Sequence, residues 1–196
     1  MGLVRGSGPH SFFLGGASGA GKTTIGLMVA EQVEGLAFVR RCTTRERRGT
    51  TDDREYTFVS PGEFDSIARS GGFLEYRHYE FGMAYGLRRS DIEDVLGTGA
   101  DSIAIMNLSR SEELSRSWPG AVTIFLEVSI EELEARLRAR GANTPEQIAE
   151  RLGNARAAML SASTYDFVVP NNARVQDAAD RVAEIIESVR NRKPIR

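Results

Sequence analysis

Residues 16–23, GASGAGKT, have the types and spacing needed to bind a polyphosphate. They match the pattern G-x-x-x-x-G-K-[ST], in which backbone N–H groups surround an anion, the lysine meets the outer phosphates and the hydroxyl meets Mg²⁺. The motif lies between an apolar run at Ser11–Gly16 and a helical pattern from Gly21 to about Val33, which is the context it requires. We therefore predict an ATP site, with Lys22 on the β- and γ-phosphates and Thr23 on Mg²⁺. The residues expected to contact ATP here are Gly16, Ala17, Ser18, Gly19, Ala20, Gly21, Lys22, Thr23 and Thr24.

A second feature is the arginine-rich segment FVRRCTTRERRG at residues 38–49. An arginine run usually forms a solvated face or a nucleic-acid patch, but the net charge of -2 and the lack of interleaved stacking aromatics disfavour nucleic acid. Arginine forks bind phosphate oxygens bidentately. We therefore expect this segment to form one wall of a phosphate pocket.

A GTPase is disfavoured, because lysine occurs only at Lys22 and Lys193 and no N-K-x-D motif is present.

The composition fits one compact domain, with 196 residues, 41% hydrophobic and 27% charged. No apolar run approaches the roughly 18 residues of a membrane span, and no secretory pattern is present, so we expect a cytoplasmic protein without a membrane partner. Cys42 is the only cysteine, which excludes an intrachain disulfide and favours a small buried residue. His10 and His78 have no metal-ligand companions at useful spacing.

Alternating strand and helix patterns predict an α/β fold with a parallel sheet. Gly141 is expected to end the helix that contains Leu133 and Leu137, and the last helix is expected to end near Val189. The strand candidates are SFFLGG, LAFV, TFV, SIAIM and VTIFLEV. The predicted capping boxes run from Ser60 to Glu63, Ser90 to Glu93, Ser129 to Glu132 and Thr144 to Gln147.

Taken in order, several segments make the chain similar to the guanylate kinase family from Phe12 to about Ile186. They are GASGAGKTT, TTRERRG, REYTFVS, FLEY, YG at Tyr85 and Gly86, RLRARG, IAERL and YDFVVPN. The resemblance implies a three-layer P-loop kinase fold with a five-stranded parallel core sheet, a mostly β substrate-binding insertion and a helical lid. The implied divisions are a flexible N-terminus at 1–10, one domain at 11–190 with its core at about 11–42 and 88–190, an insertion at about 43–87, a lid at about 136–155, and a tail at 191–196.

The resemblance also implies roles for individual residues. Glu75 is similar to the carboxylate that reads guanine, and Asn171 to a residue near the donor adenine. The residues that resemble holders of the acceptor phosphate are Arg45, Arg47 or Arg48, Tyr56 and Tyr85, with the choice between Arg47 and Arg48 open because RERRG is one residue shorter than the usual R-x-P-R-x-G. The residues that resemble the lid arginines closing over the transferred group are Arg136, Arg140 and Arg151.

Departures from the family pattern concern the acceptor site. Arg41 stands where the family has a small polar residue, and Leu87 follows YG where the family has Ser or Thr. Ile105 and Asn107 replace acidic residues, one of which helps to read guanine. Arg41, Leu87 and the NLSR segment ending at Arg110 resemble the ribose 1,5-bisphosphate phosphokinase branch instead. We therefore count Arg41 and Asn107 among the acceptor-binding residues.

The sequence predicts a Mg²⁺-dependent kinase that transfers the γ-phosphoryl group of ATP to an acceptor phosphate, with GMP as the first candidate and ribose 1,5-bisphosphate as the alternative. An acceptor phosphate has a second pKa of about 6, so it needs no general base. The catalytic candidates are Lys22, Arg45, Arg136, Arg140 and Arg151. A non-catalytic binding module is disfavoured because the P-loop is complete. A monomer and a homodimer both remain open.

Overall fold

The computed structural model describes residues 8–47, 49, 52–79, 82–106, 114, 116–139, 141 and 144–191. Arg48, Asn107, Arg110 and Arg140 lie outside these described residues. Among the helices in the described part, none combines the length and apolar character that a membrane span needs.

Five parallel strands form the core sheet in the order β2-β7-β1-β8-β9. They are β1 (Ser11–Gly16), β2 (Leu36–Val39), β7 (Asp101–Ile105), β8 (Val122–Glu127) and β9 (Phe167–Pro170). Strands of a parallel sheet are covered on both faces and so read as continuous apolar runs, which is why the first four could be predicted. The predicted five-stranded parallel sheet is confirmed.

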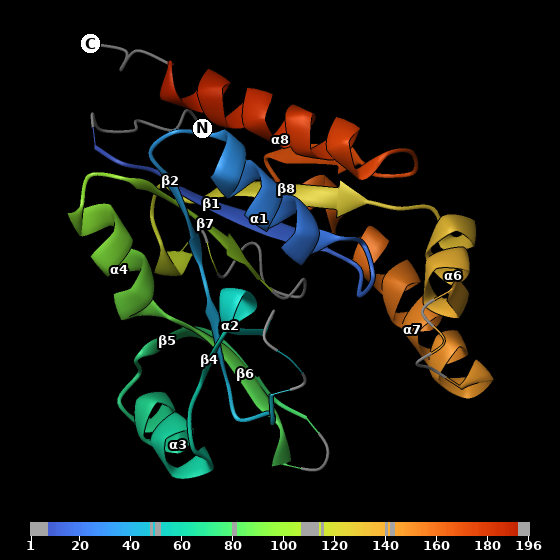
Figure 1. Ribbon diagram of the computed structural model, residues 1–196, viewed down its shortest axis with the longest axis horizontal. Helices are drawn as coiled ribbons and strands as arrows, with labels where there is room; N and C mark the ends of the chain where they lie inside the picture. Colours follow the sequence, from blue (N-terminus) through green and yellow to red (C-terminus); the bar gives the residue numbers. More distant parts are fainter. Residues whose placement is uncertain are drawn as a thin grey trace.

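Helices cover both faces of this sheet (Figure 1). Alternate residues of β1 point to opposite sides. Phe12 and Leu14 therefore share a core with α1 (Lys22–Gln32) and α8 (Val175–Arg190), which lie side by side. Phe13 belongs to the opposite core, where α4 (Arg89–Gly97) contributes Ile92. Helices α6 (Ile130–Ala139) and α7 (Pro145–Met159), which contain most of the predicted lid, pack on each other on the side toward which β8 points, and η3 (Ala162–Thr164) follows them.

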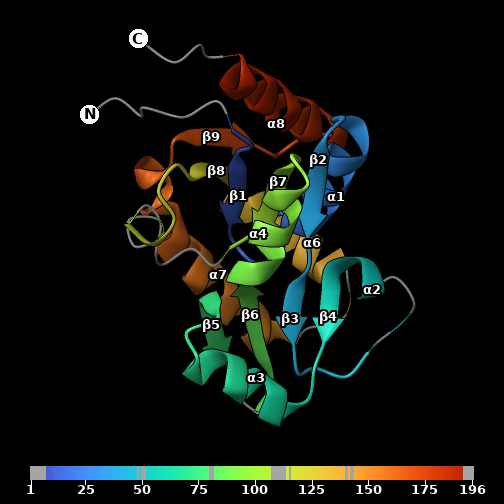
Figure 2. The same cartoon turned by 90° about the vertical axis from the view of Figure 1, so that its left-hand side faces the viewer.

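A second sheet, of order β4-β3-β6-β5, lies below the core in both views (Figures 1 and 2). Its strands are β3 (Arg41–Thr43), β4 (Tyr56–Phe58), β5 (Phe73–His78) and β6 (Ala84–Arg88). The short helix α2 (Asp52–Glu55) precedes β4, and α3 (Pro61–Arg69) covers one face through a cluster of Cys42, Phe64, Phe73 and Ala84. The opposite face of the sheet does not pack on α3. Cys42 is buried, as predicted, and burial raises the pKa of its thiol to about 11.

The caps predicted at Ser60 and Thr144 are present in the structure, whereas the one predicted at Ser90 is not. Thr144 forms the complete capping box with Gln147, and the Ser60 hydroxyl accepts from the backbone N–H of Glu63. The prediction at Ser90 is wrong. Strand β6 ends at Arg88, which is itself the N-cap of α4, so Ser90 already lies inside the helix. Arg88 instead pairs with Asp91 at 2.9 Å.

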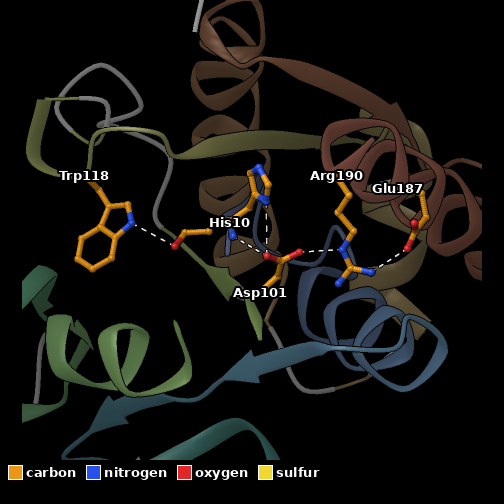
Figure 3. Close-up of polar contacts among 6 residues, drawn as sticks. His10, Asp101, Trp118, Glu187 and Arg190 are labelled. Carbon is orange, nitrogen blue, oxygen red and sulfur yellow. Dashed lines mark hydrogen bonds and ion pairs between the residues drawn. The ribbon is translucent and has the colours of Figure 1, made fainter. Parts of the chain in front are cut away.

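A buried polar network holds the amino end of the core sheet to α8 (Figure 3). The Asp101 carboxylate accepts from the backbone N–H of His10 and from Nε of Arg190, the latter at 2.8 Å. A further guanidinium nitrogen of Arg190 lies 2.8 Å from Glu187, and the Trp118 indole donates to the Ser11 hydroxyl at 3.1 Å. This network lies at the opposite end of the strands from residues 16–23.

Candidate active site

The P-loop has the backbone that its glycines permit. Gly16, Gly19 and Gly21 have φ values of 138°, 94° and 85°, and a Cβ on Gly16 would lie 2.8 Å from the Leu126 carbonyl oxygen. Only glycine tolerates both constraints at Gly16. Gly21 is the N-cap of α1, so the loop leads directly into the positive end of that helix. The segment is therefore built to receive an anion.

Lys22 lies over its own loop. Its Nζ donates to the carbonyl oxygens of Gly16 and Ala17 at 2.8 and 2.9 Å. Burial, together with the charge of Arg41 and against that of Glu75, lowers the pKa of Lys22 to about 8. A triphosphate bound here would supply anionic partners in place of two neutral carbonyls. Thr23 is half-buried in the first turn of α1, next to Lys22, whereas Thr24 is exposed.

Two of the three predicted lid arginines already lie near the P-loop. Arg151, on α7, donates from Nη1 to the Ser18 hydroxyl at 2.8 Å. Arg136, on α6, contacts Glu132 with Nε at 2.7 Å and the backbone oxygen of Asn171 with Nη2, also at 2.7 Å. Helices α6 and α7 therefore carry permanent positive charge to the place where phosphates are expected.

Asn171 is 2% exposed and lies against the P-loop. Its side-chain amide donates to the Ala20 carbonyl oxygen at 2.9 Å. The contact with a donor adenine that the resemblance implies stays a prediction. The neighbouring Asn172 was not singled out from the sequence. Its side-chain oxygen accepts from the backbone N–H of Ser129 at 2.7 Å, just before α6 begins. The repeated asparagine after an apolar strand was the available signal.

The second sheet brings four residues into one transverse row, one from each strand. Arg41 on β3 pairs in register with Tyr56 on β4, and Glu75 on β5 pairs with Leu87 on β6. Because Cys42 pairs with Gly86 across the antiparallel β3 and β6, the next pair in register is Arg41 with Leu87. Side chains opposite one another share a face of a sheet, so this row lies on the face that α3 does not cover. Two departures from the family pattern, Arg41 and Leu87, are thus neighbours.

Arg41 and Glu75 form an ion pair above the fully buried Leu87. Their Nη2 and Oε1 atoms lie 2.7 Å apart, and their side chains are 11% and 13% exposed. The charges of both residues influence the pKa of Lys22, which Arg41 lowers and Glu75 raises. Nε of Arg41 is buried and has no hydrogen-bond partner among the described residues.

Two further predicted acceptor residues, Arg45 and Tyr85, contact the ring of Tyr56. The Arg45 guanidinium lies 5.0 Å from the Tyr56 ring centroid, and Tyr85 meets the same ring edge-on at 5.8 Å. Burial, with the charge of Glu55, raises the pKa of Tyr56. The Arg47 guanidinium lies 4.9 Å from the ring centroid of Phe58, the neighbour of Tyr56 on β4, and forms an exposed ion pair with Asp53 at 3.0 Å. Arg45 and Tyr56 therefore lie next to the Arg41–Glu75 pair, whereas Arg47 is turned to an exposed carboxylate.

Few protein groups are available for Mg²⁺. The described residues contain no cluster of three or more His, Cys, Asp or Glu side chains that could hold a metal. Ile105, where the family carries an acidic residue, is an apolar side chain buried at the end of β7. Mg²⁺ commonly takes one or two protein oxygens and completes its shell with substrate phosphates and water. The Thr23 hydroxyl fits that requirement, so the residues present are compatible with the metal.

Comparisons with known proteins agree with this arrangement. The family described as guanylate kinase matches residues 9–189. A guanylate kinase of Thermus thermophilus is 34% identical over 181 residues, which cover 92% of this chain and 81% of the relative. One of Sphingopyxis alaskensis is 38% identical over 164 residues, with 82% and 74% coverage. The crystal structure of guanylate kinase from Anaplasma phagocytophilum superposes with a TM-score of 0.72 at 23% identity, covering 95% of this chain and 88% of that one. The chain therefore belongs to the guanylate kinase family, and it is a phosphotransferase.

Proposed function

We propose that this protein transfers the γ-phosphoryl group of ATP to the phosphate of GMP, forming ADP and GDP. The observation that carries the proposal is the transverse row of Tyr56, Arg41, Leu87 and Glu75, in which Arg41 and Glu75 form a mostly buried ion pair and Tyr56 lies 5.0 Å from the Arg45 guanidinium. A nucleotide acceptor needs one site for its base and one for its phosphate, both within reach of the donor. The ion pair in this row and the nearby Arg45 supply these two sites.

The chemistry asks for positioning and charge compensation. Near neutral pH the acceptor phosphate is already largely dianionic, so no residue has to remove a proton from the attacking oxygen. Arg45 and Tyr56 would hold this phosphate, while Lys22 and the lid arginines Arg136 and Arg151 offset the charge that spreads over the transferred group. Mg²⁺, when bound through Thr23 and the phosphate oxygens, would neutralise charge on the donor. Arginine suits this task because it stays protonated and offers a fixed fork.

The Arg41–Glu75 pair is complementary to guanine. Guanine presents the acceptors O6 and N7 on one edge and the donors N1–H and N2–H₂ beside them. The Glu75 carboxylate would accept from the donors, and the Arg41 guanidinium would donate to the acceptors. Adenine has an amino group in place of O6, which would face the Arg41 donors unfavourably. An arginine in this row therefore supports a 6-oxopurine acceptor.

Ribose 1,5-bisphosphate is the alternative acceptor, and Arg41 with Leu87 is the observation in its favour. A sugar bisphosphate lacks a base but carries a second phosphate, which needs an unshared cation nearby. Arg41 lies 2.7 Å from Glu75, so the pair together is close to neutral. Burial makes such a pair costly to separate. The pairing therefore favours GMP over the sugar bisphosphate.

An acceptor panel tests the proposal. ADP release is followed in a coupled assay with Mg²⁺–ATP and each of GMP, AMP and ribose 1,5-bisphosphate, with a Lys22→Ala variant as the control for contaminating kinases. We expect saturable turnover with GMP, much weaker turnover with AMP, and none above the ATP-only rate with the sugar bisphosphate. Preferential turnover of the sugar bisphosphate would overturn the assignment.

A further inference from the structure

We propose that Asn171 and Asn172, which directly follow β9, are positioning residues that align the P-loop with the lid helix α6 for phosphoryl transfer. The inference rests on the ATP site proposed above and gives Asn171 and Asn172 a role at that site that they exert through their neighbours. We refer to the two together as the asparagine bracket. Its two side chains hold two different segments, so each can be tested separately.

The order of strands explains why these segments meet. Strands β1, β8 and β9 are consecutive neighbours in the core sheet and run parallel. Their carboxyl ends therefore lie at one edge. The P-loop follows β1, helix α6 follows β8, and the asparagine bracket follows β9. The backbone N–H of Asn171 donates to the Glu127 carbonyl oxygen at 2.7 Å, which ties the bracket to the end of β8.

Asn171 controls the direction of one peptide group of the P-loop. Its amide donates to the Ala20 carbonyl oxygen at 2.9 Å, and a Cβ on Gly21 would lie only 3.0 Å from the same amide nitrogen. In a planar trans peptide the C=O and the following N–H point in opposite directions. Holding the Ala20 carbonyl on Asn171 therefore points the Gly21 N–H away from Asn171. That N–H belongs to the set of donors expected to receive the triphosphate.

Because Asn172 occupies the backbone N–H of Ser129, the Glu132 carboxylate is available to orient Arg136. In a capping box, the Glu132 side chain would accept from the backbone N–H of Ser129. Here the Asn172 side-chain oxygen takes that N–H at 2.7 Å, and Glu132 instead accepts from Nε of Arg136, also at 2.7 Å. Nη2 of Arg136 reaches the backbone oxygen of Asn171 at 2.7 Å. The guanidinium of Arg136 is thus fixed on two sides by groups that the bracket positions.

The side-chain oxygen of Asn171 indicates a role beyond packing. Its Oδ1 is buried and has no hydrogen-bond partner among the described residues. A buried polar atom without a partner lowers stability, and such atoms call for an explanation. The amide donor to Ala20 is that explanation, because an aspartate or a leucine of similar size could not supply it.

The test uses Asn171→Asp, Asn171→Ala and Asn172→Ala in the full chain, each checked for folding by circular dichroism melting. The affinity for Mg²⁺–ATP is measured by calorimetry without acceptor, and kcat is measured with saturating GMP. We expect Asn171→Ala to weaken ATP binding about three- to tenfold, the range of one neutral hydrogen bond. Asn171→Asp keeps the shape of the side chain but loses the donor and adds a negative charge beneath the triphosphate, so it should weaken binding more than alanine does. Asn172→Ala should leave ATP affinity within about twofold and lower kcat by a similar factor of three to ten, because only Arg136 is released.

Two results would overturn the bracket. One is wild-type ATP affinity in Asn171→Asp, and the other is an Asn172→Ala variant with unchanged kcat. A merely structural role predicts that the melting temperature falls in all three variants while the ATP affinity and kcat stay near the wild-type values. Failure of the wild-type protein to bind ATP would overturn the proposed function and the bracket together, whereas wild-type binding with unaffected variants would overturn the bracket alone.

Discussion

Nη2 of Arg41 lies 2.7 Å from Oε1 of Glu75, although strand β6 separates the strands that carry them. Leu87 on β6 is fully buried beneath this ion pair. Arg41 therefore reaches over an apolar residue to Glu75, the carboxylate that we propose reads guanine. Under the proposed function, Arg41 therefore belongs to the residues that set acceptor selectivity.

Replacing Arg41 should reduce the selectivity for guanine. A good bidentate contact contributes about 1–3 kcal/mol of discrimination, so Arg41→Ser should lower kcat/KM for GMP by about 10- to 100-fold. AMP turnover should fall less, because the unfavourable contact with its amino group is removed. Steady-state kinetics with both acceptors measures the ratio. Arg40→Ala is the matched control, since Arg40 is exposed and, within the described part of the chain, donates to the Asp53 backbone at 3.3 Å. An unchanged GMP-to-AMP ratio in Arg41→Ser would refute this role.

Lys22 should take up a proton when ATP binds above pH 8. Burial and the charge of Arg41 lower the pKa of Lys22 to about 8, so at pH 8.5 the lysine is mostly neutral in the free protein. The triphosphate favours the charged form, and the pKa rises on binding. Calorimetry at pH 8.5 in two buffers of different ionisation enthalpy should detect this uptake, which should be much smaller at pH 6.5. Lys22→Arg, which stays charged, should bind ATP without taking up a proton. Equal proton uptake by the lysine and arginine forms would contradict the assignment.

The same pKa makes a prediction for stability. The folded-state pKa of Lys22, about 8, lies below its ordinary value of 10.5, so between these pH values the unfolded chain binds more protons. The contribution of Lys22 to the free energy of unfolding should therefore rise with pH across this window. Denaturant titrations of wild type and Lys22→Met at pH 7.5 and 9.5 isolate that contribution. The prediction is contradicted if the free energy of unfolding of wild type, relative to that of Lys22→Met, falls between pH 7.5 and pH 9.5.

The Tyr165 hydroxyl should be dispensable for stability, unlike its ring. The ring packs edge-on against Phe125 at 5.2 Å and against the P-loop entry, where a Cβ on Gly15 would lie 2.6 Å from its Cζ. The hydroxyl is buried without a hydrogen-bond partner among the described residues. Tyr165→Phe should therefore be neutral or stabilise the protein by up to about 1 kcal/mol, whereas Tyr165→Ala should cost about 3–5 kcal/mol. Urea denaturation measures both, and a Tyr165→Phe variant that is less stable by more than about 1 kcal/mol would show a hidden partner.

Asp101 should stabilise the fold without affecting the active site. Its side chain is 7% exposed and paired with Arg190, so Asp101→Asn removes the buried one of the two carboxylates that contact this guanidinium. Loss of such a charge-assisted hydrogen bond should cost about 1.5–3 kcal/mol. Glu187→Gln is the matched control, because Glu187 is 53% exposed and its pair with the same arginine contributes little. Denaturant unfolding should separate the two variants, and the KM for ATP should stay at the wild-type value in both. A raised KM would contradict the separation of this network from the site.

Long apolar runs and the P-loop motif could be predicted from the sequence because their causes are local. Strand β1, helix α1 and the caps at Ser60 and Thr144 follow from residue types within a few positions of each other. Strands β3, β5 and β6 each contain at least one charged residue and lack a continuous apolar run, so the sequence alone does not mark them as strands. Their assignment depends on pairing between distant segments.

The residues of the candidate site also divide into those that local sequence predicts and those that depend on contacts between distant segments. The residue types of Lys22 and Arg151 and their motif were visible in the sequence, but the pairing of Arg41 with Glu75 requires the register of three strands. Asn172 escaped notice because its role depends on α6, which begins next to Ser129 more than forty positions earlier. Ser90 was misread because β6 runs directly into α4 and moves the cap to Arg88.

The formation of GDP from GMP and Mg²⁺–ATP tests the central claim most directly. Purified protein is incubated with both nucleotides, and the products are separated and quantified by ion-exchange chromatography. The account predicts GDP and ADP in equal amounts, at a rate that saturates with GMP and is lost in Lys22→Ala. ADP without GDP, or GDP formation that persists in Lys22→Ala, would contradict it.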